Sequence, residues 1–119
     1  MDLEQNTLAQ LNAATHNEYE EHDVVYKSFG DIAKKEGFDQ IAATFHMIAA
    51  IEKTHGERFN YLADLLGSGK LFISDVETGW VCLNCGHIHY GTEAPQKCPV
   101  CKHEQGYFVR VEMAPWCLN

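Results

Sequence analysis

Four cysteines in the carboxyl-terminal part of the chain have the spacing of a metal-binding quartet. They form two Cys-x2-Cys pairs separated by twelve residues: Cys82, Cys85, Cys98 and Cys101. Four thiolates at this spacing favour a tetrahedral all-sulfur site, and Gly86 leaves the first turn free to point backbone N–H groups at sulfur. Iron and zinc both accept such a site, so a structural zinc ribbon remains open. Disulfide pairing is the weaker alternative.

A second group of potential ligands lies in the amino-terminal half. Glu18 and Glu21 stand three residues apart, and so do Glu52 and His55. On a helix, this spacing places two side chains one turn apart on the same face. Carboxylate oxygens and a Glu-x-x-His pair are the ligands of dimetal sites in helical bundles. The spacing therefore favours a metal centre between helices.

The sequence around these ligands predicts two long helices. Residues from about 6 to 66 contain no proline, and apolar residues recur at alternating steps of three and four. The first helix is expected from Asn6 or Thr7 to Gly37, and the second from about Asp39 to Leu66. Because the linking turn is short, the helices should be antiparallel, which brings the two polar pairs to one level.

The polar pairs interrupt apolar stripes that should face a core. A carboxylate buried there without a partner costs several kcal/mol or becomes neutral, so three glutamates and a histidine require compensation. A bound cation supplies it. The alternative is a hydrated polar layer between the helices, in which Lys53 or Arg58 balances the charge.

One hairpin lacks half of what such a centre needs. A dimetal site of this kind takes ligands from four helices, and two helices cannot bury both flanks of long apolar stripes. Both deficits predict an obligate homodimer in which two hairpins form a four-helix bundle, with the metals on or near the two-fold axis. Helices swapped between protomers would satisfy the same requirement.

The glycines around Ser68 divide the chain into two domains. All three prolines and all four paired cysteines lie beyond Gly67. We expect residues 1–69 to form a helical hairpin and residues 70–119 a four-cysteine domain. The fold class is thus mainly α with a small β and metal-knuckle domain. Cys117 has no partner in the chain and is expected to be a free thiol.

Charge and hydropathy exclude several classes of partner. The chain of 119 residues has a formal net charge of −8, which disfavours binding to nucleic acid and to anionic lipid. No apolar run approaches the roughly 20 residues of a membrane span. The amino terminus lacks the basic and apolar regions of a signal peptide. We therefore expect a cytoplasmic protein without nucleic-acid or membrane partners.

In combination, these motifs resemble the rubrerythrin family. The closest stretches are NEYEEHDVVYKSFGDIAKKEGFDQIAATF and IEKTHGERF in the helices, and WVCLNCGHIHYGTEAPQKCPVC with KHEQGYF in the tail. The resemblance implies a ferritin-like four-helix bundle with a non-haem di-iron centre, and a rubredoxin-like domain with one iron on four cysteines. It also implies reduction of hydrogen peroxide to water, and it favours iron over zinc.

The resemblance assigns roles to single residues. Glu18 matches a terminal carboxylate ligand and Glu52 a bridging one, while His55 matches the imidazole ligand. Glu21 matches a carboxylate that exchanges on and off the iron with redox state. Tyr26 resembles a tyrosine that supports the ligands. Glu21 and Tyr26 are therefore the residues expected to take part in catalysis.

The chain also departs from the family pattern in two ways. Family members commonly carry four core helices in one chain, and this chain aligns with the second pair plus the rubredoxin-like tail. A dimer puts two copies of Glu21 at the site, where the common arrangement is asymmetric. In addition, Lys102 follows the fourth cysteine, where such turns usually have glycine. We expect it to weaken an N–H to sulfur bond and to alter the potential.

Functions from different classes follow from these features. The first is a peroxide reductase whose rubredoxin-like iron refills the di-iron site with electrons. Because no GxGxxG nucleotide pattern is present, those electrons should come from a separate reductase or carrier protein. The alternative is a metal-binding electron carrier, or a protein with a zinc ribbon, that lacks peroxidase turnover. Ferroxidase or storage activity is a third possibility, although nothing in the sequence encodes a storage cage.

Overall fold

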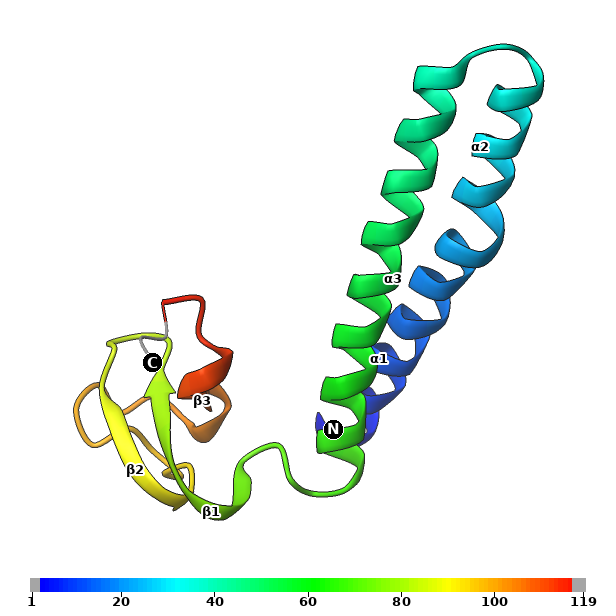
Figure 1. Ribbon diagram of the computed structural model, residues 1–119. Coiled ribbons are helices and arrows are strands. Elements are labelled where there is room, and N and C mark those ends of the chain that lie inside the picture. The colour runs from blue at the N-terminus through cyan, green and yellow to red at the C-terminus, as the bar shows by residue number, and fades with distance from the viewer. Residues whose placement is uncertain (1–2, 117–119) are drawn as a thin grey trace. The chain divides into compact units, whose positions relative to one another are not determined.

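The computed structural model describes residues 3–116 and divides the chain into two compact units, one ending at Gly67 and the next starting at Ser68. The first unit is a helical hairpin, and the second holds a three-stranded sheet with two cysteine turns (Figure 1). The predicted fold class, mainly helical with a small β and metal-knuckle region, is confirmed. The change of unit lies two residues before the predicted domain boundary.

Helix α1 (Leu3–Glu20), a π-helical segment (Glu21–Val25) and helix α2 (Tyr26–Lys35) follow one another as one helical run. The sequence predicted a single regular helix here. A π turn closes i to i+5 hydrogen bonds and takes one residue more than an α turn. The extra residue shifts the buried face by one position, so Gly30 and Ala33 are buried in α2. Phe29 and Ile32, which continue the predicted apolar stripe, are instead about half exposed.

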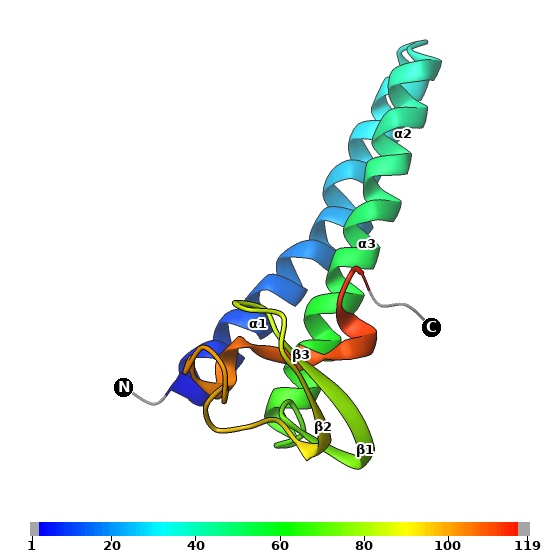
Figure 2. The ribbon, with the colours of Figure 1, turned by 90° about the vertical axis from the view of Figure 1, so that its left-hand side faces the viewer.

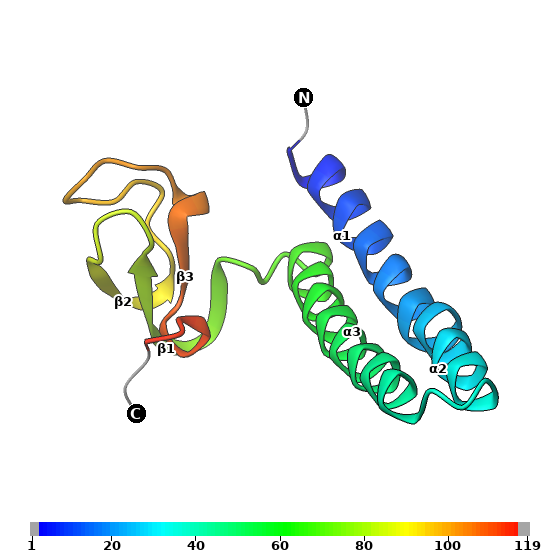
Figure 3. The ribbon, with the colours of Figure 1, turned by 90° about the horizontal axis from the view of Figure 1, so that it is seen from above.

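Helix α3 (Asp39–Gly67) returns antiparallel to α1 and α2 (Figure 1). Gly37, with φ of 87°, ends the first run in the left-handed conformation that glycine adopts without strain. Its N–H donates to Lys34 O at 3.1 Å, and the N–H of Phe38 donates to Ala33 O at 2.9 Å. This pair of bonds is the Schellman motif. Toward its amino-terminal end, α1 diverges from α3 (Figures 2 and 3).

Small residues line the contact between α3 and the other helices. The buried residues of α3 recur every seven positions, and α2 adds Gly30 and Ala33; the α3 residues are Ala42, Ala49, Gly56 and Ala63. We call these four residues the small-residue seam. Among residues 6–67, no large apolar side chain is buried, and four near the turn are 46% to 52% exposed: Phe29, Ile32, Phe38 and Ile41. A single hairpin therefore leaves its large apolar residues in contact with water.

In the second unit, the sheet has the order β2-β1-β3 with antiparallel pairing throughout. Its strands are β1 (Ile73–Cys82), β2 (Ile88–Glu93) and β3 (Phe108–Arg110). The buried core contains two of the four cysteines: it is formed by Trp80, Cys82, Ala94, Cys98 and Phe108. The potential metal ligands are thus part of the hydrophobic core of this unit.

Within residues 3–116, none of the helices combines the length and the apolar character that crossing a membrane requires.

Candidate metal centres

The four paired cysteines converge on one point of the second unit. Their sulfur atoms all lie within 4.8 Å of one another. The Sγ atoms of Cys82 and Cys101 are 3.6 Å apart, and those of Cys85 and Cys98 are 3.7 Å apart. A tetrahedron with metal–sulfur bonds of about 2.3 Å has edges of about 3.8 Å. The quartet therefore has the dimensions of a tetrahedral thiolate site.

Backbone hydrogen bonds shape the first cysteine turn. The N–H of Cys82 donates to His87 O, and the N–H of Gly86 donates back to Cys82 O, both at 2.8 Å. The N–H of His87 also points at the Cys85 sulfur, at 3.5 Å. Gly86 adopts a φ of 87°, as its predicted role in the turn requires.

The second turn repeats this pattern. The N–H of Cys98 donates to His103 O at 2.8 Å, and the N–H of Lys102 donates to Cys98 O at 3.0 Å. The backbone N–H of His103 is the largest influence that lowers the pKa of Cys101 to about 5; side-chain hydrogen bonds, first from Asn84, add to it. Lys102 thus keeps the turn that glycine forms in the first pair.

Cys85, which is exposed, and Cys101, which is half-buried, differ in their affinity for protons. Hydrogen bonding from the His87 backbone N–H lowers the pKa of Cys85, but partial burial and the three neighbouring cysteines outweigh it and raise the pKa to about 11. Without a cation, the quartet thus keeps a proton on Cys85 while Cys101 is a thiolate. A metal ion removes this asymmetry because it binds all four sulfurs as thiolates.

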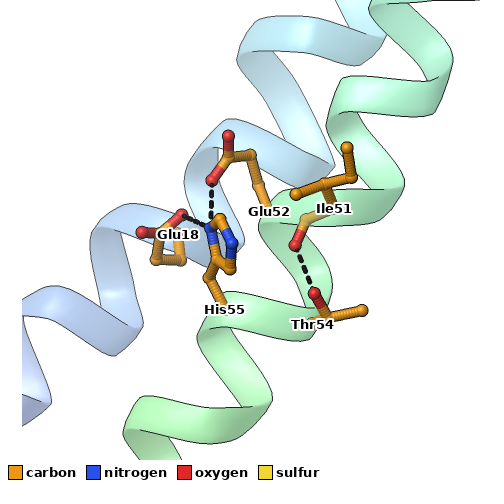
Figure 4. A network of polar contacts seen from close by, with 5 residues as sticks. All are labelled: Glu18, Ile51, Glu52, Thr54 and His55. Carbon is orange, nitrogen blue, oxygen red and sulfur yellow. Dashed lines mark hydrogen bonds and ion pairs between the residues drawn. The ribbon is translucent and has the colours of Figure 1, made fainter.

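A second cluster joins α1 to α3 in the helical unit (Figure 4). His55 Nδ1 lies 3.0 Å from Glu52 Oε2 and 3.7 Å from Glu18 Oε2. The potential ligand atoms of these three half-buried residues lie within 4.8 Å of one another. Glu18 Oε2 is buried and has no hydrogen-bond partner. An oxygen in that state is suited to accept a metal ion.

The two carboxyl groups of this cluster compete for one proton. Hydrogen bonding with Glu52 raises the pKa of Glu18, and burial and the negative charges of Glu52 and Glu21 raise it further. Hydrogen bonding with Glu18 and then with His55 lowers the pKa of Glu52. This is the behaviour of two carboxyl groups forced together without a cation. Lys53 and Arg58, the cations of the alternative polar layer, are exposed.

Glu21 and Tyr26 lie beside this cluster along the chain, at the two ends of the π segment. Glu21 is not among the residues whose ligand atoms lie within 4.8 Å of one another, but a hydrogen bond with it lowers the pKa of Glu52. Tyr26 belongs to an aromatic group, with its ring centroid 6.2 Å from those of Phe29 and Phe45. The catalytic roles expected for Glu21 and Tyr26 remain predictions.

Two residues that the sequence analysis missed control the approach of the helices at this level. Gly56 follows His55, and Tyr19 follows Glu18. A Cβ atom on Gly56 would lie 2.9 Å from Cε1 of the Tyr19 ring, closer than a carbon contact permits. Gly56 therefore lets α3 approach α1 where the cluster forms. The seven-residue recurrence of small residues was the available signal.

Two family models match this chain, and one match ends where the next begins, within strand β1. The family described as "Rubrerythrin" matches residues 5–79, and that described as "Rubrerythrin, rubredoxin-like domain" matches residues 80–109. Rubrerythrin of Clostridium perfringens is 45% identical over 108 residues, covering 91% of this chain and 55% of that protein. Rubrerythrin of Nitratidesulfovibrio vulgaris is 40% identical over 103 residues, covering 87% and 54%.

A solved structure titled "Partially Reduced State of Nigerythrin" is similar at a TM-score of 0.49 and 25% identity, covering 87% of this chain and 48% of that one. The chain spans about half the length of the curated relatives it matches. The family matches cover both the helical hairpin and the four-cysteine unit, and the identities extend over most of the chain. The chain therefore belongs to the rubrerythrin family.

Proposed function

We propose that this protein is a non-haem di-iron peroxide reductase that converts hydrogen peroxide to water. The observation that carries the proposal is the meeting of Glu18, Glu52 and His55 at one level of the hairpin, with a buried Glu18 Oε2 that lacks a hydrogen-bond partner. Carboxylate oxygen and imidazole nitrogen are suitable ligands for iron. The similarity to rubrerythrins supports iron in both clusters.

Individual residues have distinct tasks in this proposal. A pair of ferrous ions, when bound, would supply the two electrons that turn one peroxide and two protons into two waters. Glu18, Glu52 and His55 hold the ions, and Glu18 gives up its proton when it becomes a ligand. Glu21 is the proposed exchanging carboxylate, and Tyr26 supports the ligands. The four-cysteine unit is the proposed entry point for electrons from an external donor protein.

The proposed centre is shared by two chains in an obligate homodimer. Among residues 6–67, one hairpin buries small residues alone. An open groove near the turn is lined by Ala33, Glu36 and five large apolar residues: Phe29, Ile32, Phe38, Ile41 and Phe45. A second hairpin would cover this groove and complete the ligand set. Each protomer would contribute Glu18, Glu21, Glu52 and His55. Helix swapping between protomers would use the same ligands.

Substitution of single ligands tests the proposed centre. Glu52→Ala and His55→Ala should abolish iron binding by the helices and peroxide turnover, while the visible absorption of the iron tetrathiolate stays. Glu57→Ala, at an exposed position of α3, is the matched control and should behave as the unsubstituted protein. Metal analysis and peroxide consumption check these outcomes. Full loading of the helices with iron in either ligand variant would exclude the assignment.

The shared centre is tested by mass and metal content together. Light scattering of the iron-loaded protein should give a dimer with about two irons in its helical part, and no folded monomer should survive dilution. A folded monomer that holds two irons in its helices would refute the shared site.

A metal-binding electron carrier, or a protein with a zinc ribbon, is the second candidate. The sulfur–sulfur distances fit a zinc site as well as an iron site, because zinc and iron form tetrahedra of similar size with thiolates. The ultraviolet and visible spectrum separates the two, since ferric tetrathiolate absorbs strongly in the visible and zinc does not. A colourless protein without peroxide turnover would establish the zinc ribbon, and a coloured protein without peroxide turnover would establish the electron carrier.

A further inference from the structure

The two cysteine turns share their hydrogen bonds but differ at one position. Gly86 and Lys102 occupy equivalent places, and both have a positive φ, of 87° and 69°. Among residues 3–116, Lys102 is the one residue other than glycine that has a positive φ. The left-handed region is costly for a residue with a Cβ atom, and glycine adopts it freely. The second turn therefore holds Lys102 in a backbone conformation that is unfavourable for lysine.

The structure shows where that side chain places its charge. Lys102 Nζ donates a hydrogen bond to Pro99 O at 2.9 Å. Pro99 follows the ligand Cys98, and Lys102 follows the ligand Cys101. The ammonium group thus lies against the turn that supplies the sulfurs of Cys98 and Cys101. In the first turn, the equivalent residue is Gly86, which has no side chain.

A charge at this position distinguishes the two oxidation states of an iron tetrathiolate. Four thiolates with ferric iron have a net charge of −1, and with ferrous iron a net charge of −2. A nearby cation stabilises the more negative state more strongly. We propose that Lys102 raises the reduction potential of the four-cysteine iron site by holding its ammonium group over the second cysteine turn. This inference rests on the proposed presence of iron there. The redox step is the gain of one electron from the external donor protein, and no bond to a ligand breaks.

The test is a spectroelectrochemical titration of the visible tetrathiolate band in the full iron-loaded chain. Lys102→Gln should lower the midpoint potential, while Lys102→Arg should keep it because the charge is retained. Lys70→Gln is the matched control, since Lys70 is an exposed lysine of the same unit that pairs with Asp75. The shift between Lys102→Gln and the unsubstituted protein should shrink as salt is added, because ions screen an exposed charge.

A glycine variant separates the charge from the backbone. Lys102→Gly should lower the potential as much as Lys102→Gln and also raise the melting temperature, since it relieves the left-handed strain. An unchanged potential in Lys102→Gln, or an equal loss in Lys102→Arg, would overturn this inference alone. An iron-loaded chain that never shows the tetrathiolate band would overturn the iron assignment and this inference with it.

Discussion

At the scale of single residues, the metal-free fold favours the protonated form of Glu18, whereas metal binding requires its carboxylate form. Its hydrogen bond with Glu52, its burial and the neighbouring negative charges raise its pKa. A raised pKa in the folded state stabilises the metal-free fold below the ordinary glutamate pKa. That contribution is lost as pH rises through the raised value. The pKa of Glu52 is lowered, so Glu52 stabilises the fold above the ordinary glutamate pKa. That stabilisation is lost as pH falls through the folded pKa of Glu52.

Glu18→Gln should therefore stabilise the metal-free protein at pH 7 and remove its helical metal. The neutral amide replaces a carboxylate that is repelled by its neighbours, and we expect the melting temperature to rise by roughly 2–4 °C. Circular dichroism melting and metal analysis check the two effects. Glu57→Gln, on the exposed face of α3, should change neither quantity. A lower melting temperature in Glu18→Gln would contradict the crowding of charge proposed for this cluster.

Metal affinity at the helical cluster should depend on pH over an unusual range. A bound cation requires the carboxylate form of Glu18, so binding must displace its proton. Because the pKa of Glu18 is raised, the affinity should begin to fall at a higher pH than for an ordinary glutamate. Below that pKa, it should fall about tenfold per pH unit. Calorimetric titration with Co2+ at a series of pH values measures this, and an affinity that is constant down to pH 4.5 would disprove it.

At the scale of helices, local signals explain what could be predicted from the sequence. Gly37 with the short turn predicted an antiparallel hairpin, and counting residues from that turn predicted that Glu18 and Glu21 lie at one level with Glu52 and His55. The structure has the hairpin and brings Glu18, Glu52 and His55 together. Glu21 is not in the group whose ligand atoms lie within 4.8 Å of one another. The small-residue seam was not predicted, because the predicted helix faces were defined by large apolar residues. Those large residues mark the outer, open face of the hairpin, whereas its inner contact consists of alanine and glycine.

Gly56→Ala tests the spacing that the seam imposes. Alanine favours a helix over glycine, yet its Cβ would collide with the Tyr19 ring and separate α1 from α3. We expect a net destabilisation of about 1–3 kcal/mol and loss of helical metal. Gly67→Ala is the control, since its Cβ would meet Leu8 at an ordinary 3.7 Å. Denaturant unfolding and metal analysis check both variants, and normal metal loading in Gly56→Ala would show that the helices tolerate wider spacing.

At the scale of the whole molecule, the chain divides into two compact units, and the hydrophobic core cluster lies in the second. The core of the second unit includes Cys82 and Cys98, so loss of the metal there removes support from within that core. The sequence predicted this division from proline, glycine and cysteine distribution. It could not predict that two of the ligands would be buried with Trp80, because a Cys-x2-Cys spacing is the same in an exposed turn and in a buried one.

Cys82→Ser should consequently affect one unit and spare the other. We expect loss of the tetrathiolate absorption and slow turnover with a protein electron donor. Helical circular dichroism, helical iron content and the reaction of the pre-reduced helical centre with peroxide should stay near normal. Stopped-flow measurements of the pre-reduced protein provide the decisive comparison. If that centre no longer reacted, the proposed division of labour between the units would be wrong.

The π turn at Glu21–Val25 holds one residue more than an α turn, so the chain between Glu18 and Ala33 is one residue longer without a change in which faces of α1 and α2 meet α3. Removal of one residue from this segment would restore a regular helix and leave those two faces nearly in place. Removal of one residue from a regular α-helix instead rotates one side by about 100° relative to the other. Asp23 is exposed, so Asp23→Ala should be nearly silent, and deletion of Asp23 should keep Glu18 and Tyr19 facing α3. Helical circular dichroism and metal analysis of the two variants check this, and loss of helical metal in the deletion variant alone would contradict it. The π turn is thus the part of this helical run where the chain can change its length by one residue while the ligands keep their alignment.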